Sequence, residues 1–246
     1  MILPFFQKFN NRNKGLALLL DPDKYSESGL PGTIKQAESC GVDFVFVGGS
    51  LIFKGIDKLV KEIKSLTSLP VVLFPGGVLQ VCPSADTILL LSLISGRNPE
   101  YLIGNHVIMA PFIKKSGLEV IPTAYMIVDG GVRTSVEYVS NTVPLPSDKP
   151  ELAVATAIAG ELLGMRLLYM DAGSGAKYPI SSEIIRAVSN ETSIPIIVGG
   201  GIRSSEQAFS AYEAGADLIV VGNALEKSVN FLKELGEIKR SLSESH

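Results

Sequence analysis

Eight short runs of apolar residues recur along the chain, and helix-like segments separate most of them. The runs are nearly continuous rather than alternating, which is typical of strands buried on both faces of a parallel sheet. For a chain of 246 residues, this favours one α/β domain over residues 1–246, a (β/α)8 TIM barrel, with a doubly wound open sheet as the alternative. The predicted strands are Leu16–Leu20, Phe44–Val47, Val71–Phe74, Thr87–Leu91, Val120–Ile127, Leu167–Met170, Ile196–Val198 and Leu218–Val221.

The third helix of this predicted barrel is missing from the pattern. The linker between Phe74 and Thr87 reads PGGVLQVCPSAD, and its glycines and proline leave no room for a regular helix. A second irregular stretch, Asp129–Ser147, follows the fifth strand, and loops of this length are usually functional. The predicted helices are Ile34–Ser39, Lys54–Ser65, Pro99–Lys115, Lys149–Leu163, Ser182–Asn190, Ser204–Ala214 and Leu225–Leu242.

The composition excludes several classes of function. Lys+Arg 22 against Asp+Glu 25 gives a net charge of −3, and no basic block marks a nucleic-acid surface. Two cysteines, Cys40 and Cys82, cannot build a disulfide framework or a zinc cage. The only two histidines are His106 and the terminal His246, which excludes His/Cys metal sites and disfavours a Ser-His-Asp hydrolase.

A mean hydropathy of +0.30 raises the question of a membrane segment. The longest apolar stretch, Ile88–Ile94, contains Ser92 and is far shorter than the roughly 20 apolar residues of a spanning helix. The first residues carry no signal-type apolar core. We therefore expect a cytoplasmic protein whose apolar residues fill a large core, or instead line an apolar groove or a subunit interface.

Glycine-rich turns follow the last two predicted strands. Gly200 and Gly201 come after the seventh strand, and Gly222 and Asn223 come after the eighth. Glycines at these strand ends let backbone N–H groups approach an anion, and the start of the following helix adds a positive dipole end. One such turn is equally well a tight strand-to-helix connection, but two on consecutive strands favour a phosphate site.

A carboxylate and another glycine-rich turn follow the sixth strand. Gly173, Ser174 and Gly175 either widen the phosphate site or form a plain loop. Asp171 at the strand end suits a hydrogen bond to a substrate hydroxyl, or general base catalysis. For Tyr169, packing is the safer interpretation than binding.

The end of the first strand carries a candidate metal ligand. Asp21 offers a carboxylate and Ser50, at the neighbouring strand end, a hydroxyl; Mg²⁺ prefers one or two such oxygens and takes the rest from phosphate and water. The alternative is that Asp21 caps a helix or pairs with Lys24.

Three further polar residues remain open from the sequence alone. A lone helical histidine such as His106 is more often a packed residue than a catalyst. Tyr125 points either into the barrel mouth or into the core. Arg203 either binds an anion or is an exposed charge at a helix start.

With these residues assembled, the chain resembles the geranylgeranylglyceryl phosphate synthase family, which includes the bacterial heptaprenylglyceryl phosphate synthases. The resemblance implies a modified barrel that has lost its third helix, as the Phe74–Thr87 linker also indicates. Six segments in the same order carry it: LDPDK (Leu20–Lys24), FVGGS (Phe46–Ser50), YLIGNHV (Tyr101–Val107), YMDAGSGA (Tyr169–Ala176), VGGGIRS (Val198–Ser204) and VVGNALE (Val220–Glu226).

The resemblance further implies a Mg²⁺-dependent prenyltransferase that joins a long prenyl diphosphate to the 3-hydroxyl of sn-glycerol 1-phosphate. By position, Asp21 and Ser50 bind Mg²⁺, and Asp171, which is Glu in many members, orients or deprotonates the hydroxyl. Residues implied to hold glycerol 1-phosphate are Tyr169, Met170, Asp171, Ala172, Gly173, Ser174, Gly175, Gly200, Gly201, Gly222 and Asn223.

The details favour the geranylgeranyl type. Bacterial heptaprenyl enzymes tend to carry Lys where this chain has Leu19, and their sixth-strand motif lacks the AGSGA sequence. A lipid product suggests transient peripheral contact with a membrane surface, and apolar helix faces favour a homo-oligomer. A heptaprenylglyceryl phosphate synthase is the nearest alternative.

Two further alternatives share the phosphate-binding turns. A lyase or isomerase of tryptophan or thiamin synthesis on the same barrel would need a second acid–base residue and no metal at Asp21. A non-catalytic phosphate-binding regulator would gain nothing from Asp171. Neither explains the six matching segments.

Overall fold

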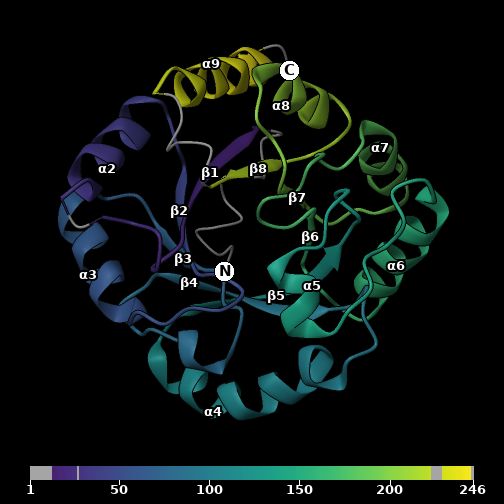
Figure 1. Cartoon of the computed structure of the whole chain (residues 1–246), viewed down its shortest axis with the longest axis horizontal. Helices are drawn as coiled ribbons and strands as arrows, with labels where there is room; N and C mark the ends of the chain where they lie inside the picture. The colour runs from purple at the N-terminus through teal and green to yellow at the C-terminus, as the bar shows by residue number, and fades with distance from the viewer. Residues whose placement is uncertain (1–12, 27, 223–228, 245–246) are drawn as a thin grey trace.

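The computed structural model describes residues 13–26, 28–222 and 229–244. Within them, eight parallel strands close into a barrel in chain order, because the first strand pairs with both the second and the eighth. Figure 1 shows this barrel from one end. The strands are β1 (Gly15–Leu20), β2 (Phe44–Val47), β3 (Val71–Leu73), β4 (Thr87–Leu93), β5 (Glu119–Ile127), β6 (Leu167–Asp171), β7 (Ile196–Gly199) and β8 (Leu218–Val221). The predicted (β/α)8 barrel is confirmed.

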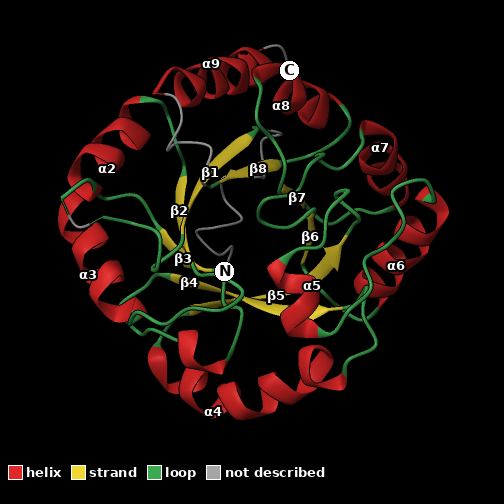
Figure 2. Cartoon of the chain, viewed as in Figure 1, coloured by secondary structure: helices red, strands yellow, loops and turns green. Residues whose placement is uncertain are grey.

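Helices surround the strands (Figure 2). The outer helix α2 begins at Leu30, four residues before the predicted start at Ile34, because a proline is tolerated in the first helical turn. Residues 225–228 of the last predicted helix lie outside the described residues. The outer helices are α2 (Leu30–Ser39), α3 (Ile56–Leu66), α4 (Asn105–Ser116) with the π-helical turn η2 (Glu100–Gly104) before it, α6 (Pro150–Leu162), α7 (Ser182–Glu191), α8 (Ser205–Glu213) and α9 (Val229–Glu244).

Two connections depart from regular barrel geometry. Between β3 and β4 the chain forms only the 3₁₀ turn η1 (Val78–Gln80), which confirms the predicted loss of the third helix. The prediction that Asp129–Ser147 is irregular is wrong in part, because the helix α5 (Ser135–Ser140) lies within it. A reciprocal pair of hydrogen bonds between Thr134 and Glu137 caps this helix, and six residues are too few to show a helical period. In Figure 2, α5 lies inside the ring of larger helices.

Strand residues alternate between the barrel interior and the layer under the helices. On β6, Leu167 and Tyr169 belong to the interior cluster, whereas Leu168 and Met170 pack under the helices. The same alternation brings Asp171 to the interior side at the mouth. Buried members of the interior cluster are Ala17, Phe44, Phe46, Val72, Leu89, Leu93, Ile121, Tyr125, Ile127, Leu167, Tyr169, Ile197, Leu218 and Val220.

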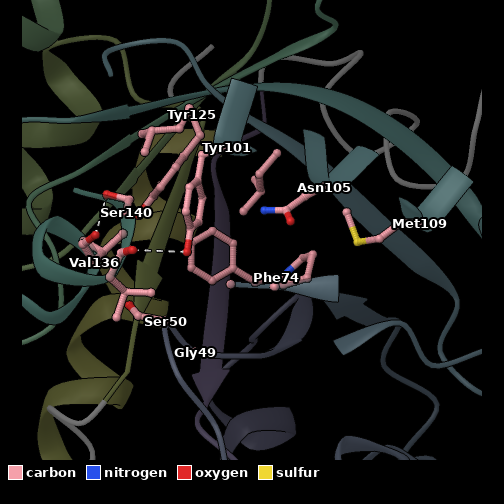
Figure 3. Close-up of a pocket in the computed structure, with 15 residues that line it drawn as sticks. Gly49, Ser50, Phe74, Tyr101, Asn105, Met109, Tyr125, Val136 and Ser140 are labelled. Atoms are coloured by element: carbon pink, nitrogen blue, oxygen red, sulfur yellow. Dashed lines mark hydrogen bonds between the residues drawn. The ribbon is translucent and has the colours of Figure 1, made fainter. Parts of the chain in front are cut away.

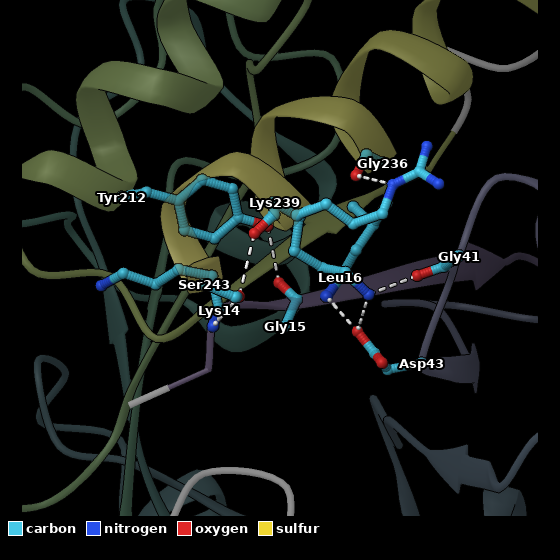
Figure 4. A network of polar contacts seen from close by, with 10 residues as sticks. Lys14, Gly15, Leu16, Gly41, Asp43, Tyr212, Gly236, Lys239 and Ser243 are labelled. Atoms are coloured by element: carbon cyan, nitrogen blue, oxygen red, sulfur yellow. Dashed lines mark hydrogen bonds and ion pairs between the residues drawn. The ribbon is translucent and has the colours of Figure 1, made fainter. Parts of the chain in front are cut away.

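A polar network at the opposite end of the barrel fastens α9 to β1 and β2 (Figure 4). The Lys239 ammonium lies 2.8 Å from the Asp43 carboxylate, and the same carboxylate accepts a hydrogen bond from the Leu16 N–H at 2.9 Å. The Tyr212 hydroxyl donates to the Gly15 carbonyl at 2.7 Å. Because Lys239 and Asp43 are largely buried, this network stabilises the end of the barrel away from the mouth. Among the described residues, no helix combines the length and the apolarity that crossing a membrane requires.

Candidate active site

A cavity of about 810 Å³ opens at the carboxyl ends of the strands. Residues from both ends of the chain line it, because the barrel closes β8 onto β1. Of the predicted site residues, it is lined by Asp21, Ser50, Tyr169, Asp171, Gly173, Ser174, Gly175, Gly200, Gly201 and Gly222. The structure therefore brings the metal candidates and the phosphate candidates to one cavity.

Asp171 is the buried acid of this cavity, and only 8% of its surface is exposed. The Tyr125 hydroxyl donates to its Oδ2 at 2.7 Å, and the Gly173 N–H donates to its Oδ1 at 2.7 Å. Burial raises the pKa of Asp171 above its usual value, and these two hydrogen bonds oppose that rise. A carboxylate whose pKa is raised at a strand end is the arrangement expected of a general base.

Three aromatic rings form the floor of the cavity beneath Asp171. Phe74 stacks on Tyr169 with ring centroids 4.8 Å apart, and Tyr125 meets both rings edge-on. The Tyr169 hydroxyl lies against Gly199, where an added Cβ would come within 2.7 Å of it. Tyr169 thus both packs and lines the cavity. Tyr125, which the sequence left open, faces the mouth and holds Asp171.

Four glycines give the phosphate-binding turns their shape. Gly173, Gly175, Gly200 and Gly201 have φ angles of 85°, 84°, 79° and 73°, which disfavour any other residue. An added Cβ at Gly200 would come within 2.7 Å of both Asp171 Oδ1 and the Gly173 nitrogen. Within the described part of the chain, the N–H groups of Ser174, Gly175, Gly200 and Gly201 have no hydrogen-bond acceptor. Such unpaired N–H groups on neighbouring turns form an anion site.

Two predicted binding residues point their side chains away from the cavity. The side chains of Met170 and Ala172 pack in the layer under the helices, so only their backbone is near the cavity. The reason is the alternation of β6, which points Tyr169 and Asp171 inward and their neighbours outward. Asn223 lies outside the described residues.

Asp21 lies at the cavity wall with Ser50. Its Oδ2 is 2.9 Å from the Lys24 ammonium, and its Oδ1 accepts the Asp23 N–H at 3.0 Å. No group of three His, Cys, Asp or Glu side chains that could hold a metal exists among the described residues. One carboxylate and one hydroxyl fit Mg²⁺ only when phosphate oxygens and water complete its coordination. The residues therefore suit an ion that arrives with a phosphorylated ligand.

Two polar side chains that the sequence did not single out hold the loops around the cavity. Gln80 donates to the Gly49 carbonyl at 2.8 Å and accepts the Gly76 N–H at 3.2 Å, which ties η1 to the end of β2. The Asp23 carboxylate accepts the Phe53 and Lys54 N–H groups, each at 2.8 Å. Only the sequence motif LDPDK hinted at Asp23, and no local pattern marks Gln80.

A second, apolar cavity of about 50 Å³ adjoins the first where the third helix is absent (Figure 3). Phe74, Tyr125 and Ser50 line both cavities. Tyr101 and Met109 line the second cavity from the side of η2 and α4. This apolar cavity, hereafter the apolar channel, therefore adjoins the polar site where the third helix is absent.

Arg203 lines the polar cavity and also has a structural contact. Arg203 donates to the Ala176 carbonyl at 2.6 Å, which bridges the turns after β6 and β7. His106 is half-buried, and burial lowers its pKa. Neither the polar nor the apolar cavity has His106 in its lining.

Comparison with known proteins decides the family. A model of the PcrB family matches residues 10–240. The chain belongs to the PcrB family. The geranylgeranylglyceryl phosphate synthase of Chitinophaga pinensis is 52% identical over 225 residues, which are 91% of this chain and 89% of that relative. The synthase of the same name from Korarchaeum cryptofilum is 44% identical over 229 residues, 92% of this chain and 93% of that one.

A solved structure of a geranylgeranylglyceryl phosphate synthase also matches this PcrB-family chain. The (S)-3-O-geranylgeranylglyceryl phosphate synthase of Thermoplasma acidophilum, in complex with its substrate sn-glycerol-1-phosphate, matches with a TM-score of 0.91 and 34% identity, over 98% of this chain and 100% of that chain. The thiamine phosphate pyrophosphorylase of Pyrococcus furiosus matches at 18% identity with a TM-score of 0.59, over 94% of this chain and 98% of that chain, which shows a shared barrel fold alone. The resemblance carried by the six sequence segments is confirmed.

Proposed function

We propose that this chain transfers the geranylgeranyl group of geranylgeranyl diphosphate to the 3-hydroxyl of sn-glycerol 1-phosphate, with release of diphosphate. The observation that carries the proposal is a buried carboxylate, Asp171, beside four unpaired N–H groups in a cavity that adjoins the apolar channel. The names of the relatives and the sn-glycerol-1-phosphate complex of the Thermoplasma acidophilum enzyme support it.

Binding of the acceptor follows from the glycine turns. The N–H groups at Gly175, Gly200 and Gly201 bind the phosphate of glycerol 1-phosphate. The glycerol then extends toward Asp171, which accepts a hydrogen bond from the reacting hydroxyl. Tyr125 and the Gly173 N–H hold both carboxylate oxygens in place, so the base needs little reorganisation.

Transfer breaks the bond between C1 of the prenyl chain and the diphosphate oxygen, and the acceptor oxygen bonds to C1. The hydroxyl proton passes to Asp171, and the diphosphate leaves with the bonding electrons. Mg²⁺ held by Asp21 and Ser50 would supply charge stabilisation to the leaving group. The aromatic rings of Phe74 and Tyr125 exclude water, which would otherwise capture the allylic cation.

The apolar channel supports a prenyl donor rather than the small substrates of other phosphate-binding barrels. It is lined by Leu91, Leu93, Tyr101 and Met109. None of these side chains carries a charge that could bind a polar substrate. A lyase or isomerase of the same fold has no use for such a channel. The heptaprenyl donor is the second candidate, and Leu19 at the cavity wall favours the shorter one.

The test uses purified protein, radiolabelled sn-glycerol 1-phosphate and geranylgeranyl, farnesyl or heptaprenyl diphosphate. Label should enter an organic-extractable product with Mg²⁺ and not with EDTA, and glycerol 3-phosphate should be a poor acceptor. The donor that gives the highest kcat/KM identifies the chain length. Failure of folded protein with every donor would refute the proposal.

Assembly and location extend the proposal. The outer face of η2 and α4 exposes Ile103, Val107, Ile108 and Phe112 by 54–68%, which supports a homo-oligomer that buries this helix face. Light scattering on the purified protein measures the assembly. A cytoplasmic location stays a prediction, and fractionation of the source cells would test it.

A further inference from the structure

Three large apolar side chains are exposed to solvent on two neighbouring loops. Leu51 and Phe53 follow β2 and are 58% and 86% exposed, and Leu79 in η1 is 91% exposed. The two loops are in contact, because Gln80 bonds to Gly49 on the first loop and to Gly76 on the second. Exposed apolar residues grouped in this way usually mark an interaction surface.

The backbone of this surface is braced. The backbone N–H groups of Phe53 and Lys54 each donate to the Asp23 carboxylate at 2.8 Å. A charged group from the loop after β1 therefore holds the turn that carries Phe53. Charge-assisted hydrogen bonds of this length are among the stronger ones in proteins. The apolar tips are therefore held in place before any partner arrives.

The same loops form the rim of the apolar channel. Ser50 and Gly77 line it; the exposed Leu51 comes directly after Ser50 in the chain, and the exposed Leu79 is two residues after Gly77. Exposed apolar side chains thus lie within two residues of the channel lining. If the tips are embedded in a hydrocarbon phase, a long prenyl chain can pass from that phase to the channel without crossing water.

Lysines lie next to the tips. Lys54 follows Phe53, and Lys58 lies one helical turn further along α3; both are exposed. The Lys54 ammonium also lies 5.6 Å from the centroid of the Tyr25 ring, and Lys61, another turn along, is paired with Asp57 at 2.6 Å. Lysines beside inserted apolar residues attract anionic lipid headgroups and extend their ammonium groups to them.

We propose that this surface, formed by Leu51, Phe53 and Leu79 with Lys54 and Lys58, docks the protein on an anionic lipid bilayer. The proposal rests on the proposed function for its purpose, which is to pass the prenyl donor and the lipid product between the bilayer and the channel. The geometry favours a bilayer over a second copy of the chain, because separate tips on loops with lysines beside them suit headgroups, whereas the apolar face of α4 suits another helix.

The first test is flotation of the full chain with phosphatidylcholine vesicles, with and without phosphatidylglycerol. Because the net charge of the chain is −3, we do not expect it to adsorb to anionic vesicles without a dedicated binding surface. We expect flotation with the anionic vesicles. Replacing both Phe53 and Leu79 by serine should weaken vesicle binding at least tenfold. That is the loss of affinity expected when one such side chain is no longer buried away from water. Replacing Lys54 and Lys58 by glutamine should weaken it about fivefold for each lysine, on the anionic vesicles alone.

The matched control replaces Leu162 and Leu163 by serine. They are 82% and 73% exposed at the carboxyl end of α6, away from the mouth, and their replacement should leave flotation unchanged. The Phe53/Leu79 variant should keep its activity on a short prenyl diphosphate in solution but lose transfer from geranylgeranyl diphosphate embedded in vesicles.

Three results would overturn the docking proposal. They are no flotation of the unaltered chain, equal flotation of the Phe53/Leu79 variant, and a lower molar mass of that variant in light scattering, which would assign the surface to a contact between copies. Flotation needs no catalysis. Absence of transfer by protein that floats would refute the proposed function and leave the docking surface in place.

Discussion

Replacing Tyr125 by phenylalanine removes one hydroxyl group and leaves a ring that packs on Phe74 and Tyr169 at 5.7 and 5.6 Å. The lost group is the donor to Asp171 Oδ2 at 2.7 Å, in a buried pair. A hydrogen bond to a charged group contributes about 1.5–3 kcal/mol. Since about 1.4 kcal/mol corresponds to a factor of ten, we expect kcat/KM for prenyl transfer to fall about 10- to 100-fold at neutral pH.

The pH dependence gives the sharper result. The Tyr125 hydrogen bond lowers the pKa of Asp171 against the larger effect of burial, so its loss raises that pKa further. Asp171 acts as a base only when ionised, so the acid limb of the kcat/KM profile should move to higher pH in Tyr125→Phe. The assay is single-turnover transfer across the pH range where the protein stays folded.

A matched control is Tyr101→Phe. The Tyr101 hydroxyl donates to the Val139 carbonyl at 3.4 Å and makes no hydrogen bond to the Asp171 carboxylate. This variant should keep the pH profile of the unaltered enzyme even if its KM for the prenyl donor changes. A profile of Tyr125→Phe that coincides with the original, or moves to lower pH, would refute the role assigned to Asp171.

Three further predictions test the phosphate turn, the α9 network and the metal. Gly200→Ala, at φ 79° and with its Cβ 2.7 Å from Asp171 Oδ1, should weaken glycerol 1-phosphate binding at least tenfold in calorimetry, whereas Gly32→Ala, with nothing within 4 Å, should not. Lys239→Met should lower the free energy of unfolding by about 2–4 kcal/mol in urea titrations, and exposed Lys233→Met should leave it unchanged. Asp21→Asn should raise the Mg²⁺ concentration for half-maximal transfer at least tenfold, in metal titrations followed by product formation.

Local pattern predicted most of the fold. Each strand from Leu16 to Val221 was found from its apolar run, because a strand buried on both faces needs apolar residues at nearly every position. The glycines of the Phe74–Thr87 linker correctly excluded a helix. The helix α5 was missed because its signal is a cap, Thr134 with Glu137, rather than a period.

Of the candidate site, the sequence predicted some residues correctly and others not. Gly200 and Gly201 were predicted because a phosphate turn needs glycines, and their positive φ angles agree with that need. Met170 was named only because it lies between Tyr169 and Asp171, and the alternation of β6 turns its side chain outward. A strand alternates whatever ligand it serves, so contiguous residues of one strand cannot all face the cavity.

The sequence by itself determined the order of strands and helices, the lost third helix, and the positions of the glycines and carboxylates at strand ends. These follow from local backbone geometry and from the burial of each strand. Only the tertiary structure decided that Tyr125 meets Asp171, 46 residues further along the chain, and that Gln80 joins the loops after β2 and β3. The period of a strand sets the side to which a residue points, but barrel closure sets which residues meet there, and closure depends on all eight strands together.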